Sequence, residues 1–281
     1  MDISLAEEHA YYFVPQISPE VARDRIEKKK TTLVAGMFGT LISRPNPSDI
    51  QEVSAENRLE PYWAVTVATR TAYDRQQTYT IPLKGEEVRE VTLLGQKLTI
   101  SSKGNPALTL NGIEHCVDER RITRFFDGLS GQKTDLGRYQ SFAKTEINDL
   151  EHFAPEGLLV IPPEMRATAI VRQVLSEAIQ PVGKAQIIHE ERVDVEVLEL
   201  NFRPVYALEY EWASKGKRVV VEFDALLGDI RSGGKKWSDQ IKGILTRDLF
   251  FDVTADAVGM IVPGGGIAVK LVKAVVDRGK K

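Results

Sequence analysis

The predicted fold rests on two stretches of sequence, Leu59-Glu60-Pro61-Tyr62-Trp63-Ala64-Val65 and Phe202-Arg203-Pro204-Val205-Tyr206-Ala207-Leu208. When the two are aligned, proline coincides with proline and alanine with alanine. After each proline, large apolar residues alternate with other residues, which is typical of a β-strand with one buried face. The two stretches therefore predict two similar strands, one in each half of the chain.

The segments around these strands follow the same order in both halves. A helix start with an early proline and a glutamate precedes each strand, at residues 17–22 and 161–166, where the proline loses no hydrogen bond and the glutamate suits the helix dipole. A short polar connection and a second strand follow each of them, at residues 78–83 and 218–223, so we predict an antiparallel hairpin in each half. Three features in one order indicate an internal duplication.

The second half also resembles a known small module. Its hairpin runs from residues 206–212 through a Lys-Gly-Lys turn to residues 219–230, which end with Asp224, Ala225, Gly228 and Ile230. This is similar to a PepSY repeat, in which a helix, here residues 163–179, precedes such a hairpin. The resemblance covers about residues 161–234 and extends faintly to 17–83, where the aspartate and glycine are missing. It implies a non-catalytic fold, often found beside peptidases or membrane proteins, with proposed roles in inhibition or partner binding.

Physically, the end of that hairpin is a turn. The Asp224 side chain is expected to accept hydrogen bonds from the backbone just after it, and Gly228 to supply a positive φ. Leu226 and Leu227 stand where the family usually has polar residues.

The remaining segments are predicted to be short strands, a helical connector and a C-terminal pair of helices. Residues 88–110 indicate short strands that extend the first sheet, with a hairpin turn at Gly95 and Gln96, whereas the charged residues 115–153 indicate a loose helical connector. Residues 257–276 are almost wholly apolar, but Pro263 and the glycines after it interrupt a single spanning helix. We therefore predict a helical hairpin formed by residues 241–262 and 267–278.

Together these features predict an α+β fold. Two related halves, each a helix with an antiparallel sheet, are joined by a helical connector and followed by the C-terminal helical hairpin. The expected boundaries are 1–112 for the first half, 113–157 for the connector, 158–234 for the second half and 235–281 for the hairpin.

Composition excludes several classes of function. The 281 residues include 37 basic and 40 acidic side chains, so the net charge of -3 provides no field that attracts nucleic acid. The single cysteine, Cys116, and the absence of a secretory signal pattern at the acidic N-terminus predict a cytoplasmic protein. The histidines lack the spacing of a metal site, and no phosphate-binding loop follows a strand, so neither a metal nor another cofactor is expected.

Three groups of residues are candidates for function. His115, Cys116 and Asp118 supply the side chains of a thiol enzyme, together with His189, although neighbours in sequence point in different directions. An aromatic contact surface on the predicted sheets would comprise Tyr62, Trp63, Tyr206, Tyr210 and Trp212. Contacts of the apolar tail would involve Ile261, Ile267, Val269, Lys270 and Lys273.

The leading hypothesis from sequence is a non-catalytic binding or regulatory module, an adaptor for a protein or peptide partner that engages it through the apolar tail. The first alternative is a hydrolase or transferase with a thiol-based site between the halves. The second is a peripheral membrane protein that attaches to a membrane surface by its tail. The sequence predicts no oligomeric state.

Overall fold

The computed structural model describes residues 1–43, 46–100, 106–237, 246–253 and 270–273. Strands account for 51% of the residues and helices for 18%, and ten strands of the described chain form one mixed sheet. The predicted α+β class is therefore wrong. The two halves do not build a sheet each, because their strands pair with one another.

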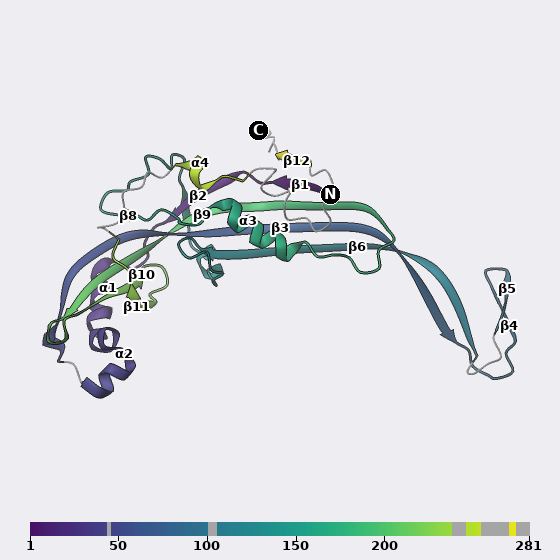
Figure 1. The fold of residues 1–281 in the computed structure, drawn as a ribbon, viewed down its shortest axis with the longest axis horizontal. Helices are drawn as coiled ribbons and strands as arrows, with labels where there is room; N and C mark the ends of the chain where they lie inside the picture. The colour runs from purple at the N-terminus through teal and green to yellow at the C-terminus, as the bar shows by residue number, and fades with distance from the viewer. Residues whose placement is uncertain (44–45, 101–105, 238–245, 254–269, 274–281) are drawn as a thin grey trace.

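Three long strands form the sheet: β3 (Ile50–Pro82), β6 (Ala107–Asp127) and β9 (Ile187–Trp212). In the middle lies β3, which is antiparallel to both neighbours. Its register with β9 runs from Ile50 opposite Trp212 to Asp74 opposite Ile187. Figure 1 shows these strands running along the longest axis of the molecule.

Shorter strands extend the sheet on both sides. β10 (Lys217–Asp224) pairs antiparallel with residues 205–212 of β9, and β11 (Ile230–Gly234) pairs with β10. The others are β1 (Asp2–Leu5) and β2 (Glu8–Phe13), which pair with β9; β7 (Lys144–Glu146), which pairs with β2; β8 (Leu159–Val160), which pairs with β3; and β12 (Lys270–Lys273), which pairs with β1.

Few residues are helical. The helices are α1 (Pro19–Glu27), α2 (Lys30–Ser43), α3 (Ala167–Ala178) and α4 (Arg247–Phe250), with single 3-10 turns at Pro47–Asp49, Gly137–Ser141 and Ala213–Lys215. As predicted, α1 starts with a proline in its first turn, and the Ser18 hydroxyl accepts a hydrogen bond from the Val21 amide.

The two halves interlock through their helices and short strands. Helix α3 belongs to the second half but packs on β3 and β6, whereas α1 of the first half packs on β9 and β10. The strands that precede these helices are exchanged in the same way, since β2 pairs with β9 and β8 pairs with β3. In both halves, a short strand is followed by a helix, a long strand and a strand that pairs antiparallel with the long one. The short strand pairs with the long strand of the other half, and the helix packs on the sheet of the other half.

The predicted turn at Asp224 is confirmed. Its Oδ1 atom accepts hydrogen bonds from the Leu226 and Leu227 amides, both at 2.9 Å. The Gly228 amide donates to the Asp224 carbonyl at 2.8 Å, and Gly228 has a φ of 77°. The Ala225 amide donates to the Pro204 carbonyl, which ties the turn to the start of the matched stretch.

The same turn is present in the first half, at Asp127, beyond the residues where the sequence suggested a second copy. Asp127 Oδ1 accepts hydrogen bonds from the amides of Leu129 and Ser130, at 3.1 and 2.8 Å. The Gly131 amide donates to the Asp127 carbonyl, and the amide next to Asp127 donates to the carbonyl of Pro61. Pro61 with Asp127 and Pro204 with Asp224 are therefore connected by the same pattern of hydrogen bonds. Pro61 and Asp127 are much further apart in sequence than Pro204 and Asp224.

The prediction for residues 78–83, which lie between Pro61 and Asp127, is wrong. They do not form the second strand of a hairpin but the end of β3, which continues through the expected connection. Residues 71–77 contain no glycine, proline or asparagine, so nothing in them forces a turn. Their polar side chains reflect exposure on a strand rather than a loop.

The helical connector at 113–157 is also wrong, because β6 continues to Asp127. Its charged residues are tolerated in a strand since they pair with charges on other strands of the sheet: Glu114 with Arg75 of the neighbouring β3, and Arg121 with Glu196 of β9. The hairpin at residues 90–99 is confirmed, but its turn lies at Leu94 and Gly95 and not at Gly95 and Gln96 as predicted. It forms a separate two-stranded sheet and does not extend the first one.

The C-terminal helical hairpin is not borne out either. Among the described residues of 235–281, helix occurs only in the four residues of α4, and residues 270–273 form a strand that pairs in parallel with β1. Most of the two predicted helices lies outside the described residues. Placing 270–273 in the sheet is enough to exclude the second helix as predicted.

Candidate partner-binding arm

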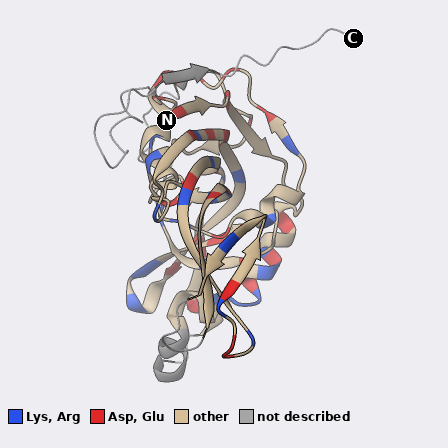
Figure 2. Cartoon of the chain, turned by 90° about the vertical axis from the view of Figure 1, so that its right-hand side faces the viewer, with Lys and Arg blue, Asp and Glu red and all other residues tan. Residues whose placement is uncertain are grey.

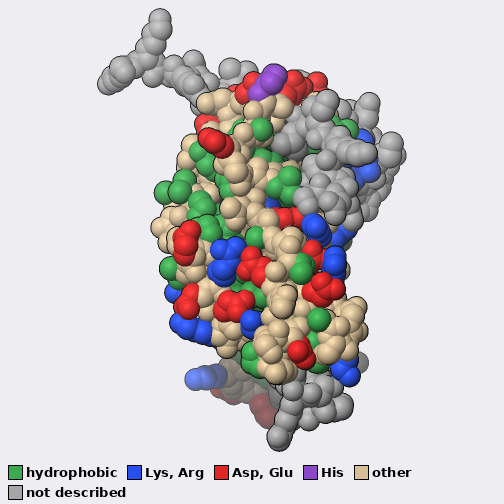
Figure 3. Space-filling model, turned by 90° about the vertical axis from the view of Figure 1, so that its left-hand side faces the viewer, with side chains coloured by type: hydrophobic (Ala, Val, Ile, Leu, Met, Phe, Trp, Pro, Cys, Tyr) green, Lys and Arg blue, Asp and Glu red, His purple; other side chains and the backbone are tan. Residues whose placement is uncertain are grey.

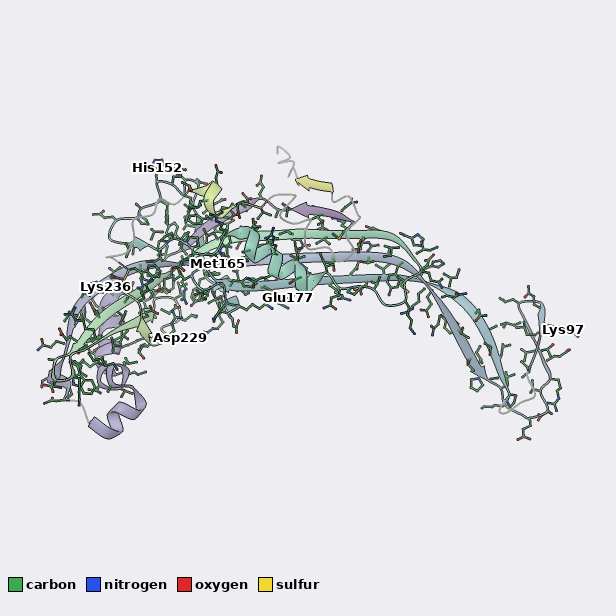
Figure 4. The ribbon with its side chains drawn as sticks, in the orientation of Figure 1. Lys97, His152, Met165, Glu177, Asp229 and Lys236 are labelled. Atoms are coloured by element: carbon green, nitrogen blue, oxygen red, sulfur yellow. The ribbon has the colours of Figure 1, made fainter. Side chains whose placement is uncertain are left out.

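A two-stranded arm projects from the body of the molecule. We define the arm as residues 75–82 of β3 and 107–114 of β6, together with the hairpin of β4 (Glu90–Leu93) and β5 (Gln96–Thr99). It begins where β9 stops pairing with β3, just after a register shift between Ala72 and Tyr73. Such irregularities bend a sheet. Figures 1 and 4 show the arm turning away from the body, with Lys97 at its far end.

Exposed apolar side chains concentrate on the arm and its root. Those on the arm are Tyr79, Ile81, Leu93, Leu94 and Ile113, and those at the root are Val117, Ile187 and Ile188. A two-stranded ribbon is a single layer and has no second layer that would cover these side chains. The apolar side chains that the body exposes are separated from one another, which is normal for a protein surface.

The most unusual residue of the arm is Leu94, at the tip of its hairpin. Leu94 has a φ of 51° and is followed by Gly95 with a φ of 80°. Two successive positive φ values define a type I′ turn, which asparagine and glycine favour, and for leucine a left-handed backbone costs roughly 1–2 kcal/mol. The side chain is also 96% exposed. No contact within the described chain offsets either cost, which suggests contact with another molecule.

One face of the arm is held by a small polar cluster. Glu114 receives hydrogen bonds from the Tyr79 hydroxyl at 2.6 Å and from Arg75 Nε at 2.7 Å. These bonds, first from Tyr79 and then from Arg75, lower the pKa of Glu114. The Tyr79 ring covers Gly112, where a Cβ atom would lie 3.2 Å from Cε2. The cluster stabilises the register of the two strands.

A second polar cluster lies on the other face, at the root of the arm. Asp74 is in the central strand β3, and its two carboxylate oxygens lie 2.7 Å from His115 Nδ1 and 2.9 Å from His189 Nε2. The histidines come from β6 and β9, so the cluster joins all three strands where the third one ends. Hydrogen bonds from His115 and then from His189 lower the pKa of Asp74. The carboxylate thus acts as a structural brace.

This brace bears on the thiol residues predicted from sequence. His115 is bound to Asp74, whereas Cys116, the next residue of the strand, points to the opposite face and donates to the Glu114 carbonyl at 3.7 Å. Asp118 is paired with Arg120. His189 is likewise bound to Asp74 and not to the thiol. Within the described residues, no group of histidine, cysteine or acidic side chains is arranged to hold a metal ion.

The five aromatic residues predicted to form a contact surface are buried in the body. Trp63 donates to the Met165 carbonyl at 3.0 Å, Tyr206 to the Ile17 carbonyl at 2.9 Å, and Tyr210 to Glu27 at 2.8 Å. Tyr62 and Trp212 are buried as well. The Tyr62 hydroxyl and the Trp212 indole nitrogen have no hydrogen-bond partner in the described chain. These rings therefore fill the core between sheet and helices.

The predicted tail contacts fall in two groups. Ile261, Ile267 and Val269 lie outside the described residues. Lys270 and Lys273 are the first and last residues of β12. In the part of the chain that the structure describes, no helix has the length and apolar character needed to cross a membrane.

Sequence reasoning missed a buried ionic network where the two matched stretches cross. Glu60 is opposite Arg203 in the sheet, and their side chains are 2.8 Å apart. Arg58, fully buried, pairs with Glu60 and Glu222. The sequence interpretation allowed only one buried face per strand, whereas here both faces are covered. Charged residues that alternate with Leu59 and Pro61 were the available signal.

The second part of this network surrounds Asp224. The Tyr139 hydroxyl donates to Asp224, and Arg203 donates to the Tyr139 hydroxyl at 3.0 Å. Burial raises the pKa of Tyr139 to about 12. Since these side chains are buried and satisfy one another, the network stabilises the body and is not available to a ligand.

A hollow of about 360 Å³ opens on the sheet above the arm root, lined by Arg70, Arg121 and Arg192 among others. All three are already in ion pairs, with Glu119, Glu196 and Asp194 respectively. The hollow therefore offers no unpaired positive charge for an anion.

No protein-family model, curated protein or solved structure matches this chain. The functional inference below is therefore drawn from its own residues.

Proposed function

We propose that this chain is a non-catalytic binding protein whose projecting arm engages a protein partner. The observation that carries the proposal is Leu94, which combines a positive φ with nearly full exposure at the far end of the arm. Large exposed apolar side chains commonly mark interaction sites. In this proposal Leu94 enters an apolar pocket of the partner and Leu93 packs at its edge.

The charges of the arm favour a protein over a membrane or nucleic acid. Among the described residues between β3 and β6, the basic residues Lys84, Arg89 and Lys97 are balanced by the acidic residues Glu86, Glu87 and Glu90. Seen from the side of the arm, the cartoon in Figure 2 has acidic and basic residues interspersed along the chain, and the opposite end of the molecule also shows both kinds of side chain intermingled (Figure 3). Binding to anionic lipid or to phosphates requires clustered positive charge instead.

Two expectations from sequence belong to this proposal. The PepSY-like pattern at residues 161–234 lies outside the arm, but the roles in inhibition or partner binding that it implies fit a non-catalytic binding protein. A cytoplasmic location agrees with a single unpaired thiol, Cys116. The thiol-enzyme alternative has less support, because His115 and His189 both bind Asp74 instead of approaching Cys116.

Site-specific photo-cross-linking in living cells tests the proposal. A photoreactive phenylalanine analogue replaces Leu94 in one variant and Val53, an exposed residue of the body, in a matched control. We expect a discrete cross-linked protein from position 94 and none from position 53. Cross-links to lipid, to a second copy of this chain, or equally from both positions would contradict the proposal.

A further inference from the structure

Strand β6 has a long open edge. The described residues pair it with β3 on one side. On the other side, only its C-terminal end is covered, where Phe126 forms a bridge with Lys133 and the Phe125 carbonyl accepts a hydrogen bond from the Thr134 amide. From 107 to 124, no described strand covers the outer edge. Open edges present unpaired N–H and C=O groups to other strands.

The charges along this edge are ordered, with acidic residues first and basic residues last. Glu114 precedes Val117, and Arg120 and Arg121 follow it. In an antiparallel pair of two identical strands, the beginning of one faces the end of the other. The edge of β6 is therefore complementary to itself.

We propose that β6 pairs antiparallel with β6 of a second copy of this chain, with a two-fold axis at Val117. In this register each Glu114 faces Arg120, each His115 faces Glu119, and the two Val117 side chains meet. These charged side chains also bond to neighbours in their own chain, so the contacts across the axis would extend existing ion pairs. Such opposite-charge and aliphatic cross-strand pairs stabilise a sheet, and the contact is the same patch on both copies. The pairing also covers Val117 and Ile113, which are 55% and 62% exposed in the single chain.

Neighbouring registers are excluded by charge. A two-fold axis perpendicular to the sheet keeps each face on its own side, so the axis must pass through a residue. With the axis at Cys116, Glu114 faces Asp118. With the axis at Asp118, the two Asp118 side chains face one another. Like charges directly opposite are destabilising, so of these three registers only the one centred on Val117 is free of such a contact.

This inference goes beyond the proposed function, since it concerns self-association through the strand edge and not the tip of the arm. It gives the dimer two arms that point in opposite directions, because the paired strands are antiparallel. Two tips on one rigid sheet allow bivalent binding, which raises avidity without a new contact.

Cysteine cross-linking of the full chain tests the register. In a Cys116→Ser background, Val117→Cys is expected to form a disulfide-linked dimer on mild oxidation. Ile113→Cys and Arg121→Cys are each expected to stay uncross-linked alone and to cross-link when mixed, because position 113 faces position 121. Efficient cross-linking of Ile113→Cys alone, or none in the mixture, would overturn the proposed register.

Light scattering tests the dimer itself. The native chain is expected to have twice the 31.4 kDa mass of one copy at micromolar concentration. Val117→Lys places two like charges at the axis and should weaken dimerisation at least tenfold, whereas Val53→Lys, a control at an exposed valine of the body, should leave it unchanged. A native chain that is monomeric, or a Val117→Lys variant that dimerises normally, would overturn the proposal.

Discussion

The body and the arm of this protein use the same strands in opposite ways. In the body, residues 58–67 of β3 and 200–208 of β9 are buried on both faces, and even Arg58 and Glu60 are withdrawn from water into ion pairs. In the arm, the same strand β3 runs on with one neighbour and exposes Tyr79 and Ile81. The difference shows that neighbouring layers, and not strand sequence alone, decide whether an apolar residue serves the core or remains available to a partner.

The body should lose the most stability when its core is opened. Trp63→Ala is expected to lower the free energy of unfolding by about 3–5 kcal/mol, because a fully buried indole and its hydrogen bond to Met165 are removed. Tyr79→Ala in the arm should change it by less than about 1 kcal/mol. Urea unfolding followed by circular dichroism measures both, and equal losses would mean that the arm belongs to the core.

A comparable loss is expected from the buried network. Arg58→Met removes the buried arginine shared by Glu60 and Glu222, which leaves Glu60 only with Arg203 and Arg231 and Glu222 only with Arg231; this should cost about 3–5 kcal/mol. Adding Glu222→Leu to that variant should recover part of the loss, since it removes one buried charge that has lost its closest partner. The same unfolding measurements decide the matter; an unaffected Arg58→Met variant would show that the network contributes little.

Tyr62 tests whether a buried aromatic of the body has any polar role. Because its hydroxyl is buried without a hydrogen-bond partner in the described chain, Tyr62→Phe should leave stability unchanged or raise it by up to about 1 kcal/mol. A clear loss of stability would instead reveal a polar interaction of that hydroxyl.

At the root of the arm, the expected effect depends on pH. The histidines lower the pKa of Asp74 in the folded protein, so their contribution is present above the ordinary aspartate pKa and is lost as the pH falls through the lowered value. Replacing His115 and His189 by glutamine should return the pKa of Asp74 toward its ordinary value. Carboxyl carbon NMR titration measures this, and an unchanged pKa in the double variant would show that the histidines do not brace Asp74.

The smallest effect on stability is expected at the tip. Leu94→Asn suits the type I′ turn and should leave the free energy of unfolding unchanged or slightly raised, while it abolishes partner binding. The measurement is a comparison of urea midpoints together with cross-linking from a photoreactive group at the neighbouring position 93. Binding that survives the substitution would remove Leu94 from the interface.

These regions also differ in how far the sequence predicts them. The turn at Asp224 follows from local residue preferences, and the sequence predicts it. The hairpin at residues 90–99 is predicted as well, but its turn lies one residue earlier than expected, because Leu94 adopts a positive φ that leucine does not favour. The sequence does not predict the arm, because residues 71–77 lack a turn signal but are polar enough to resemble a connection. The charges of β6 favour a helix, since the stability of this strand comes from cross-strand ion pairs that depend on partners distant in sequence.

The sequence does not predict the candidate site either, because the site also depends on partners distant in sequence. The sequence marks Tyr62 and Trp63 as large aromatics but does not reveal that α3 and the loops cover them. Conversely, the exposure of Leu94 and the approach of His115 and His189 to Asp74 depend on where β9 ends. Tertiary pairing, which a single sequence does not specify, decides both.

Removal of the arm tests the division between body and arm most directly. Residues 77–112 are replaced by Asn-Gly, so that Gln76 and Ile113, which face each other in the native sheet, flank a two-residue turn. The free energy of unfolding, measured in urea, should change by less than about 1 kcal/mol, because the core and its ion pairs remain. Loss of cooperative unfolding, or a loss of several kcal/mol, would show that the arm is part of the fold and would contradict its role as a separate binding element.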